Sequence, residues 1–134
     1  MKKEVANLWI KALRSGKYKQ GICALHTDDN KYCCLGVLCD LYDKDRKEKK
    51  KKSIKISKPK YNGNKNQHCY RYGDEYDFLP TIVKKWAGMK SKKGSLELDG
   101  SHVDLSILND GESYFGRKTF KEIANIIETN IDIL

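Results

Sequence analysis

The chain has 134 residues, of which 39% are hydrophobic and 34% are charged, and its formal net charge is +9. This length is typical of one domain built around a single hydrophobic core. No run of about 18 apolar residues is present, which excludes a membrane-spanning helix. The first residues also lack the continuous apolar region of a signal peptide. We therefore expect one domain over residues 1–134, located in the cytoplasm and not in contact with a membrane.

The positive charge is concentrated in one segment. Residues 44–60 hold ten Lys or Arg against two acidic residues, whereas the other 117 residues hold 17 bases and 16 acids. Like charges four residues apart repel on a helix, so we expect a basic mobile insert at about residues 43–67. Such an insert is a solvated loop, a tether for nucleic acid or a patch for anionic membranes. Because aromatic residues do not interleave with the lysines, we favour the loop, with at most weak and non-specific nucleic-acid binding through Lys44–Lys60.

Amphipathic helices are expected at both ends of the chain. Over residues 3–15 the apolar residues recur at helical spacing and form one stripe: Val5, Leu8, Trp9, Ala12 and Leu13. Gly16 follows, where the end of a helix favours a left-handed residue. The last helix begins at Thr119, which forms a capping-box pattern with Glu122.

Short β-structure and further helices are expected between these two ends. Residues 18–34 resemble a β-hairpin around the turn residues 28–30, and residues 33–42 favour a short buried helix. Pro80 is suited to the first turn of another helix, and residues 96–98 favour a strand. The fold class is therefore α+β, a small single domain with amphipathic terminal helices around a short β-hairpin or antiparallel sheet.

Five cysteines are present, so at least one of them is unpaired, and we interpret all of them as free thiols. A helix beginning near Cys33 or Cys34 would lower a thiol pKa, and His102 with Asn109 or Asp104 would complete a cysteine-dependent hydrolase. Buried, inert cysteines explain an apolar Cys-Cys pair better. The spacing of cysteine and histidine is not typical of zinc sites. We therefore expect no catalytic residue, no metal and no cofactor.

Polar and aromatic residues at the ends of the predicted elements are the candidates for binding. Tyrosine stacks on bases, arginine and lysine pair with phosphates, and amides read base edges or ribose hydroxyls. Residues at element ends project from a rigid scaffold, which favours a ligand site. The predicted ligand-binding residues are Arg14, Lys17, Tyr18, Gln20, Arg71, Tyr72, Asn109, Asp110 and Arg117.

Several strings resemble a family of small, uncharacterised phage and prophage proteins. The most specific is YCCLGVLCDL at Tyr32–Leu41, which is preceded by WIKALRSGKYKQG at Trp9–Gly21. Shorter similar pieces are Leu79–Trp86, Leu108–Asp110 and Phe120–Glu128. The lysine-rich segment departs from this pattern.

The resemblance implies a phage accessory protein that acts in the host bacterial cell. Such proteins often antagonise host immunity, and some are oligomers that bind a nucleotide immune signal without cleaving it. Cyclic ADP-ribose isomers and cyclic dinucleotides are signals of this kind. We therefore expect a non-enzymatic homo-oligomer that binds a small nucleotide. The alternatives are a protein- or nucleic-acid-binding accessory factor and the cysteine-dependent hydrolase.

Overall fold

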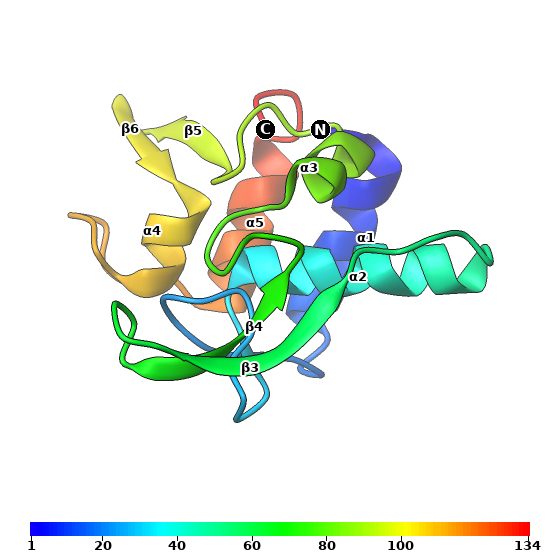
Figure 1. Ribbon diagram of the computed structural model, residues 1–134. Helices are drawn as coiled ribbons and strands as arrows, with labels where there is room; N and C mark the ends of the chain where they lie inside the picture. The colour runs from blue at the N-terminus through cyan, green and yellow to red at the C-terminus, as the bar shows by residue number, and fades with distance from the viewer.

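A computed structural model describes all residues 1–134, which form a small single α+β domain (Figure 1). The elements in chain order are α1 (Lys3–Arg14), β1 (Lys19–Gln20), β2 (Lys31–Tyr32), α2 (Cys34–Glu48), β3 (Ile56–Asn62), β4 (Gln67–Tyr72), α3 (Thr81–Ala87), β5 (Ser95–Leu98), β6 (Ser101–Asp104), α4 (Leu105–Asp110) and α5 (Phe120–Thr129). The strands form three separate pairs, β1–β2, β3–β4 and β5–β6. The fold class predicted from the sequence is confirmed. No helix is long and apolar enough to span a bilayer.

The terminal helices α1 and α5 pack against each other, and α2 lies across them in the middle of the domain (Figure 1). Trp9 of α1 is fully buried and its indole Nε1 donates to the carbonyl of Cys34 at 2.9 Å, which joins α1 to the first turn of α2. Ile123 and Ile127 present the buried face of α5. Burial of these apolar faces, rather than helix propensity, stabilises the arrangement.

The predicted helix boundaries depend on local signals, and these are confirmed. Gly16 has a φ of 73° after the end of α1. At α5, Thr119 accepts a hydrogen bond from the backbone of Glu122 at 3.3 Å, while the Glu122 carboxylate accepts one from the backbone of Thr119 at 2.8 Å. One side chain departs from the prediction, because Leu8 of the apolar stripe is 49% exposed.

The hairpin predicted over residues 18–34 is wrong. The strands β1 and β2 pair in parallel over two residues each, and the intervening loop pairs with β4 instead. Thr27 forms a bridge to Cys69, and the carbonyl of His26 accepts from the backbone of Tyr70 at 3.0 Å. Cys23 and Asn30 both have a φ of 61°, which turns the chain away from a regular hairpin.

The structure also differs from the mobile insert expected over residues 43–67. Helix α2 continues through the first lysines because carboxylates four residues earlier pair with them: Lys44 with Asp40, Lys47 with Asp43 and Lys49 with Asp45, at 2.6–2.8 Å. These pairs replace the expected repulsion by attraction. The rest of the segment forms β3, which pairs with β4 in an antiparallel hairpin.

Gly36 determines how closely α2 approaches the preceding loop. A Cβ atom at this position would lie 1.7 Å from the carbonyl oxygen of Leu25. Only glycine allows this contact without moving the helix.

We therefore expect Gly36→Ala to lower the free energy of unfolding by about 3 kcal/mol, because the helix must separate from the loop. Gly63→Ala is the matched control, since its nearest heavy atom lies 3.9 Å away, and we expect a change within about 0.5 kcal/mol. Urea unfolding of both variants measures the difference. Equal stabilities would show that α2 and the loop separate at little cost.

Candidate functional site

A groove between α1 and α2 brings together two of the predicted ligand-binding residues. We call it the tyrosine–lysine groove. It has a volume of about 410 Å³ and is lined by Leu8, Lys11, Ala12, Ser15, Lys17, Tyr18, Asn30, Tyr32, Asp40, Leu41 and Lys44. Helix α1 contributes its exposed Leu8 to this lining, so the residue that leaves the buried stripe provides apolar surface in the groove.

The tyrosine rings of the groove are held in fixed positions. The Tyr18 hydroxyl donates to the Asp40 carboxylate and accepts from Lys44 Nζ at 3.0 Å, and Lys44 also pairs with Asp40 at 2.8 Å. The Tyr18 ring packs edge-on against Tyr32, with centroids 5.2 Å apart. Burial raises the pKa of Tyr32 to about 12 and also raises the pKa of Tyr18, so both phenols are protonated at neutral pH.

The groove carries an excess of positive charge. Lys11, Lys17 and Lys44 face one carboxylate, Asp40, and this carboxylate is already paired with Lys44. Lys11 and Lys17 have no acidic partner and are exposed. The groove therefore offers two free ammonium groups, protonated phenols and an apolar surface, which together suit an anion with a flat ring system.

Next to the groove, His26 lies in a stack of aromatic rings. Its ring is parallel to Tyr32 and Tyr70, with centroids 4.0 and 4.1 Å away, and only 8% of the residue is exposed. Its Nδ1 lies 3.2 Å from the hydroxyl of Tyr72 and its Nε2 lies 3.1 Å from Oδ1 of Asn30. A neutral ring with its proton on Nε2 satisfies both contacts. Burial lowers the pKa of His26, and the hydrogen bond to Asn30 opposes this shift.

We expect His26 to make the protein less stable as the pH falls. The unfolded chain binds a proton near pH 6.5 while the folded His26 stays neutral, so the free energy of unfolding decreases from pH 7 downwards, by at most about 1.4 kcal/mol for each pH unit. Urea unfolding at pH 7.5 and 5.5 measures the decrease, and His26→Gln should have a smaller one. The nearest carboxylates, Asp40 and Asp29, favour the protonated ring and so reduce the decrease that His26 causes. An identical decrease in both proteins would assign it to other groups.

The other predicted ligand-binding residues lie outside this groove, and two of them form a buried polar network. Asn109 is fully buried; its Oδ1 accepts from the backbone of Cys34 at 3.1 Å and from Gln20 Nε2 at 3.0 Å, and its Nδ2 donates to the carbonyl of Gly21 at 2.8 Å. Gln20 also accepts from the backbone of Phe120 at 3.1 Å. Their amides therefore join α2, the loop after β1, α4 and α5 instead of facing a ligand.

Asn109→Asp tests this network. The substitution removes the Nδ2 donor and buries a second carboxylate beside Asp110, so we expect a loss of about 3 kcal/mol in the free energy of unfolding. Asn7→Asp is the control, because Asn7 is exposed on α1, and it should change stability by less than about 0.5 kcal/mol. Chemical denaturation measures both values, and a similar small effect of the two substitutions would contradict the structural role.

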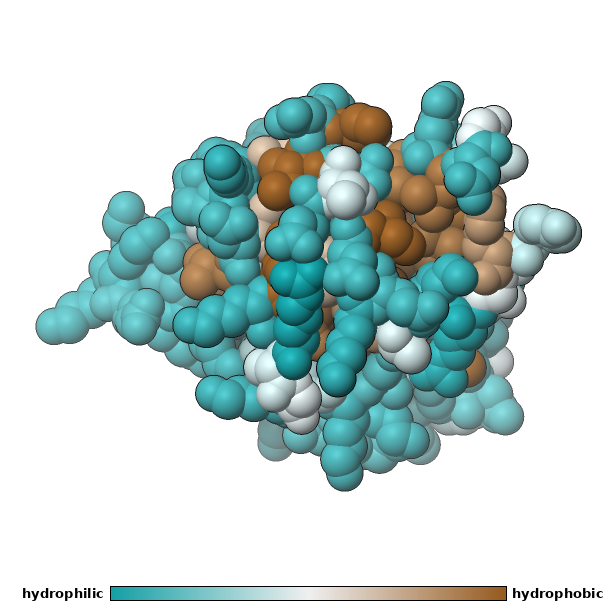
Figure 2. All heavy atoms as spheres, turned by 180° about the vertical axis from the view of Figure 1, so that it is seen from behind, coloured by the Kyte–Doolittle hydropathy of each residue, from teal (hydrophilic) through white to brown (hydrophobic).

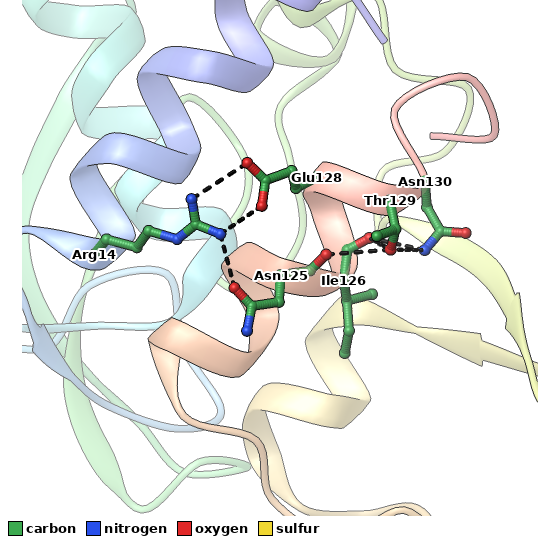
Figure 3. A network of polar contacts seen from close by, with 6 residues as sticks. All are labelled: Arg14, Asn125, Ile126, Glu128, Thr129 and Asn130. Carbon is green, nitrogen blue, oxygen red and sulfur yellow. Dashed lines mark hydrogen bonds and ion pairs between the residues drawn. The ribbon is translucent and has the colours of Figure 1, made fainter.

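Arg14, the last residue of α1, points toward α5 and contacts Asn125 and Glu128 of that helix (Figure 3). Its guanidinium donates to Glu128 Oε2 at 2.6 Å and to Asn125 Oδ1 at 2.7 Å. This contact with Arg14 lowers the pKa of Glu128. Arg14 thus connects the two terminal helices, whereas its neighbours Lys11 and Lys17 have no acidic partner.

The remaining four predicted residues lie in four different places. Arg71 lies over the ring of Tyr76 at 5.9 Å, and Tyr72 is 1% exposed beneath the His26 stack. Arg117 shares a hollow of about 260 Å³ with Gln20, and Asp110 lines a separate cavity of about 190 Å³. The nine predicted ligand-binding residues do not form one pocket, because the helix and strand ends that carry them lie in different parts of the domain.

The cavity near Asp110 contains possible metal ligands. Ligand atoms of Cys23, Asp110 and Glu112 lie within 4.8 Å of one another. Lys65 and Lys93 line the same cavity and pair with two further carboxylates, Asp77 at 3.0 Å and Asp104 at 3.9 Å, while Glu112 is exposed to solvent, and exposed acidic groups commonly cluster without a metal. We assign no metal to this cavity.

The cysteines do not have the properties of a nucleophile. All five are free thiols. Cys33 caps α2 by accepting from the backbone of Gly36 at 3.4 Å, yet burial raises its pKa to about 12. Burial also raises the pKa of Cys34, Cys39, Cys23 and Cys69. Cys33 and Cys34 are buried, as we expected, and the lowered thiol pKa of the hydrolase alternative is not found, because desolvation outweighs the helix dipole.

The sequence prediction included Lys17 and Tyr18 but missed other groove residues, among them Lys11, Tyr32, Asp40 and Lys44. Lys44 and Asp40 stand at the i, i+4 spacing of a helical ion pair, and this spacing is a signal that points to them. Tyr32 reaches Tyr18 only because the intervening loop folds back onto β4, and no local pattern indicates this.

The fold and the groove define a small α+β domain with a cationic, aromatic surface site. A family model described as a domain of unknown function, DUF8296, matches residues 1–131, and the chain belongs to this family. No curated protein and no solved structure shows a significant match to the chain.

Proposed function

We propose that the protein binds a nucleotide immune signal in the tyrosine–lysine groove and sequesters it without cleaving it. The observation that carries this proposal is the position of the free ammonium groups of Lys11 and Lys17 beside the fixed rings of Tyr18 and Tyr32. The ammonium groups pair with phosphates, and the rings pack against a base. Cyclic ADP-ribose isomers and cyclic dinucleotides have both features.

Binding rather than chemistry suits the residues of the groove. Its one carboxylate, Asp40, accepts from Tyr18 and pairs with Lys44, so it is committed to holding the site together. Ser15 carries the aliphatic hydroxyl of the groove, and it donates to the carbonyl of Ala12 at 2.6 Å. These groups fix the shape of the groove and leave the two lysines for the ligand.

The biological setting is part of the same proposal and depends on the sequence resemblance. A phage protein that acts in the cytoplasm of the infected bacterium protects the phage when it removes the signal that activates host defence. A homo-oligomer suits this role, because a second copy placed over the half-exposed Leu8 would close the groove around its ligand.

Calorimetric titration of a panel of cyclic ADP-ribose isomers and cyclic dinucleotides tests the proposal. We expect submicromolar binding of one member by the unmodified protein. Lys11→Ala and Lys17→Ala should each weaken it tenfold or more, about 1.4 kcal/mol, because each removes a phosphate contact. Lys85→Ala and Lys121→Ala are matched controls on other exposed helix surfaces and should leave the affinity unchanged.

The outcomes distinguish the function from the site. Absence of binding to every panel member would contradict the sequestration of these ligands. Binding that the Lys11 and Lys17 variants leave unchanged would move the site elsewhere on the domain. After heat denaturation of the complex, chromatography of the supernatant should return the ligand intact, and recovery of a product would make the protein an enzyme.

A further inference from the structure

The segment between α2 and β4 carries a second cationic surface. Helix α2 ends at a tip that projects from the body, and the chain returns from this tip into β3 (Figure 1). Seen from behind, the projecting part of the molecule is hydrophilic throughout (Figure 2). Six exposed lysines of the segment between α2 and β4 have no carboxylate partner. Together we call them the lysine surface: Lys50, Lys51, Lys52, Lys55, Lys58 and Lys60.

The backbone beneath the lysine surface is attached to the domain. The amide of Lys51 donates to the carbonyl of Arg46 at 2.8 Å, and the Ser53 hydroxyl donates to Asp43 at 2.7 Å. The carbonyl of Lys55 accepts from Gly73 at 2.8 Å. The lysines are therefore displayed from an ordered chain, so binding a polyanion would cost less backbone entropy than binding by a disordered tail.

An aromatic ring follows the last lysine. The β3–β4 register shifts between Ser57 and Lys60, and both Lys60 and Tyr61 are exposed after this irregularity. Tyr61 is 60% exposed, and its hydroxyl donates to Asn66 Oδ1 at 2.8 Å. The Tyr61 ring is thus held in one position while much of it remains accessible.

We propose that the lysine surface and Tyr61 bind single-stranded nucleic acid. Lysines neutralise successive phosphates of the strand, and the Tyr61 ring stacks on an unpaired base. A base inside a duplex does not offer its face for stacking, so the ring favours single strands. A membrane is a poorer partner, because the apolar side chains of this segment are Ile54, which is half-buried, and Ile56, which is 37% exposed. This surface is separate from the residues of the tyrosine–lysine groove.

Fluorescence anisotropy with a labelled 20-nucleotide single strand, as RNA and as DNA, tests the role of the lysines. The variant K50Q/K51Q/K52Q/K58Q should lose at least tenfold in affinity at 50 mM NaCl. The slope of log K against log salt should fall in magnitude by about 3. K3Q/K19Q/K85Q/K121Q removes the same charge from other exposed positions, and we expect a change of less than about threefold. Equal losses in the two variants, or no binding by the unmodified protein, would overturn the proposal.

Tyr61→Ala tests the preference for single strands. It should weaken single-strand binding about fivefold or more and leave binding to a duplex of equal length unchanged. Tyr114→Ala is the matched control, because Tyr114 is fully exposed elsewhere on the surface, and it should have no effect. No effect of Tyr61→Ala on the single strand would overturn the assignment of stacking. Flotation of the protein with phosphatidylglycerol vesicles at 150 mM NaCl, without nucleic-acid binding, would make the surface a membrane contact instead.

Discussion

The arrangement of this domain depends on the side-chain amide of Asn109. Its two polar atoms contact the first turn of α2, the chain after β1, the side chain of Gln20 and the neighbouring Asp110, and Asn109 itself is fully buried. Segments that are far apart in the sequence meet at this one residue. A buried amide stabilises a fold only when all of its hydrogen bonds are made, so the network also selects one packing over others of similar hydrophobic burial.

The position of the groove follows from this packing. Gln20 holds the chain after α1 against α5, and this contact places Lys17 and Tyr18 on the open side of α1. Two of the residues that the sequence suggested for a ligand therefore serve to orient two others. Polar residues near element ends have both kinds of role, and only their burial distinguishes them: Asn109 is fully buried, whereas Lys17 is exposed.

The sequence predicts those parts of the structure that depend on neighbours along the chain. The capping box of α5 and the left-handed Gly16 involve residues within one helical turn, and both are confirmed. Contacts across the fold were not predictable: the loop around Thr27 pairs with Cys69 instead of completing a hairpin, because β4 supplies an edge that no local pattern shows. Helix α2 extends beyond the predicted residue 42, to Glu48, because carboxylates one turn before the lysines pair with them. The groove could be predicted only at Lys17 and Tyr18, since Tyr32 reaches it through that same loop.

Helix α2 has a geometric consequence, because it carries Asp40 and Lys44 of the groove and ends directly before the lysine surface. Asp40, which fixes Tyr18, and Glu48, the last residue of α2, are separated by eight residues, a distance of about 12 Å at the helical rise. The three carboxylate–lysine pairs along this stretch keep it helical. A small anion in the groove and a strand on the lysine surface would consequently stand at a fixed spacing, and their like charges would repel across it. Occupation of one surface would then lower the affinity of the other surface for its ligand, most strongly at low ionic strength. The effect would be reciprocal, because each bound ligand repels the other across the same helix.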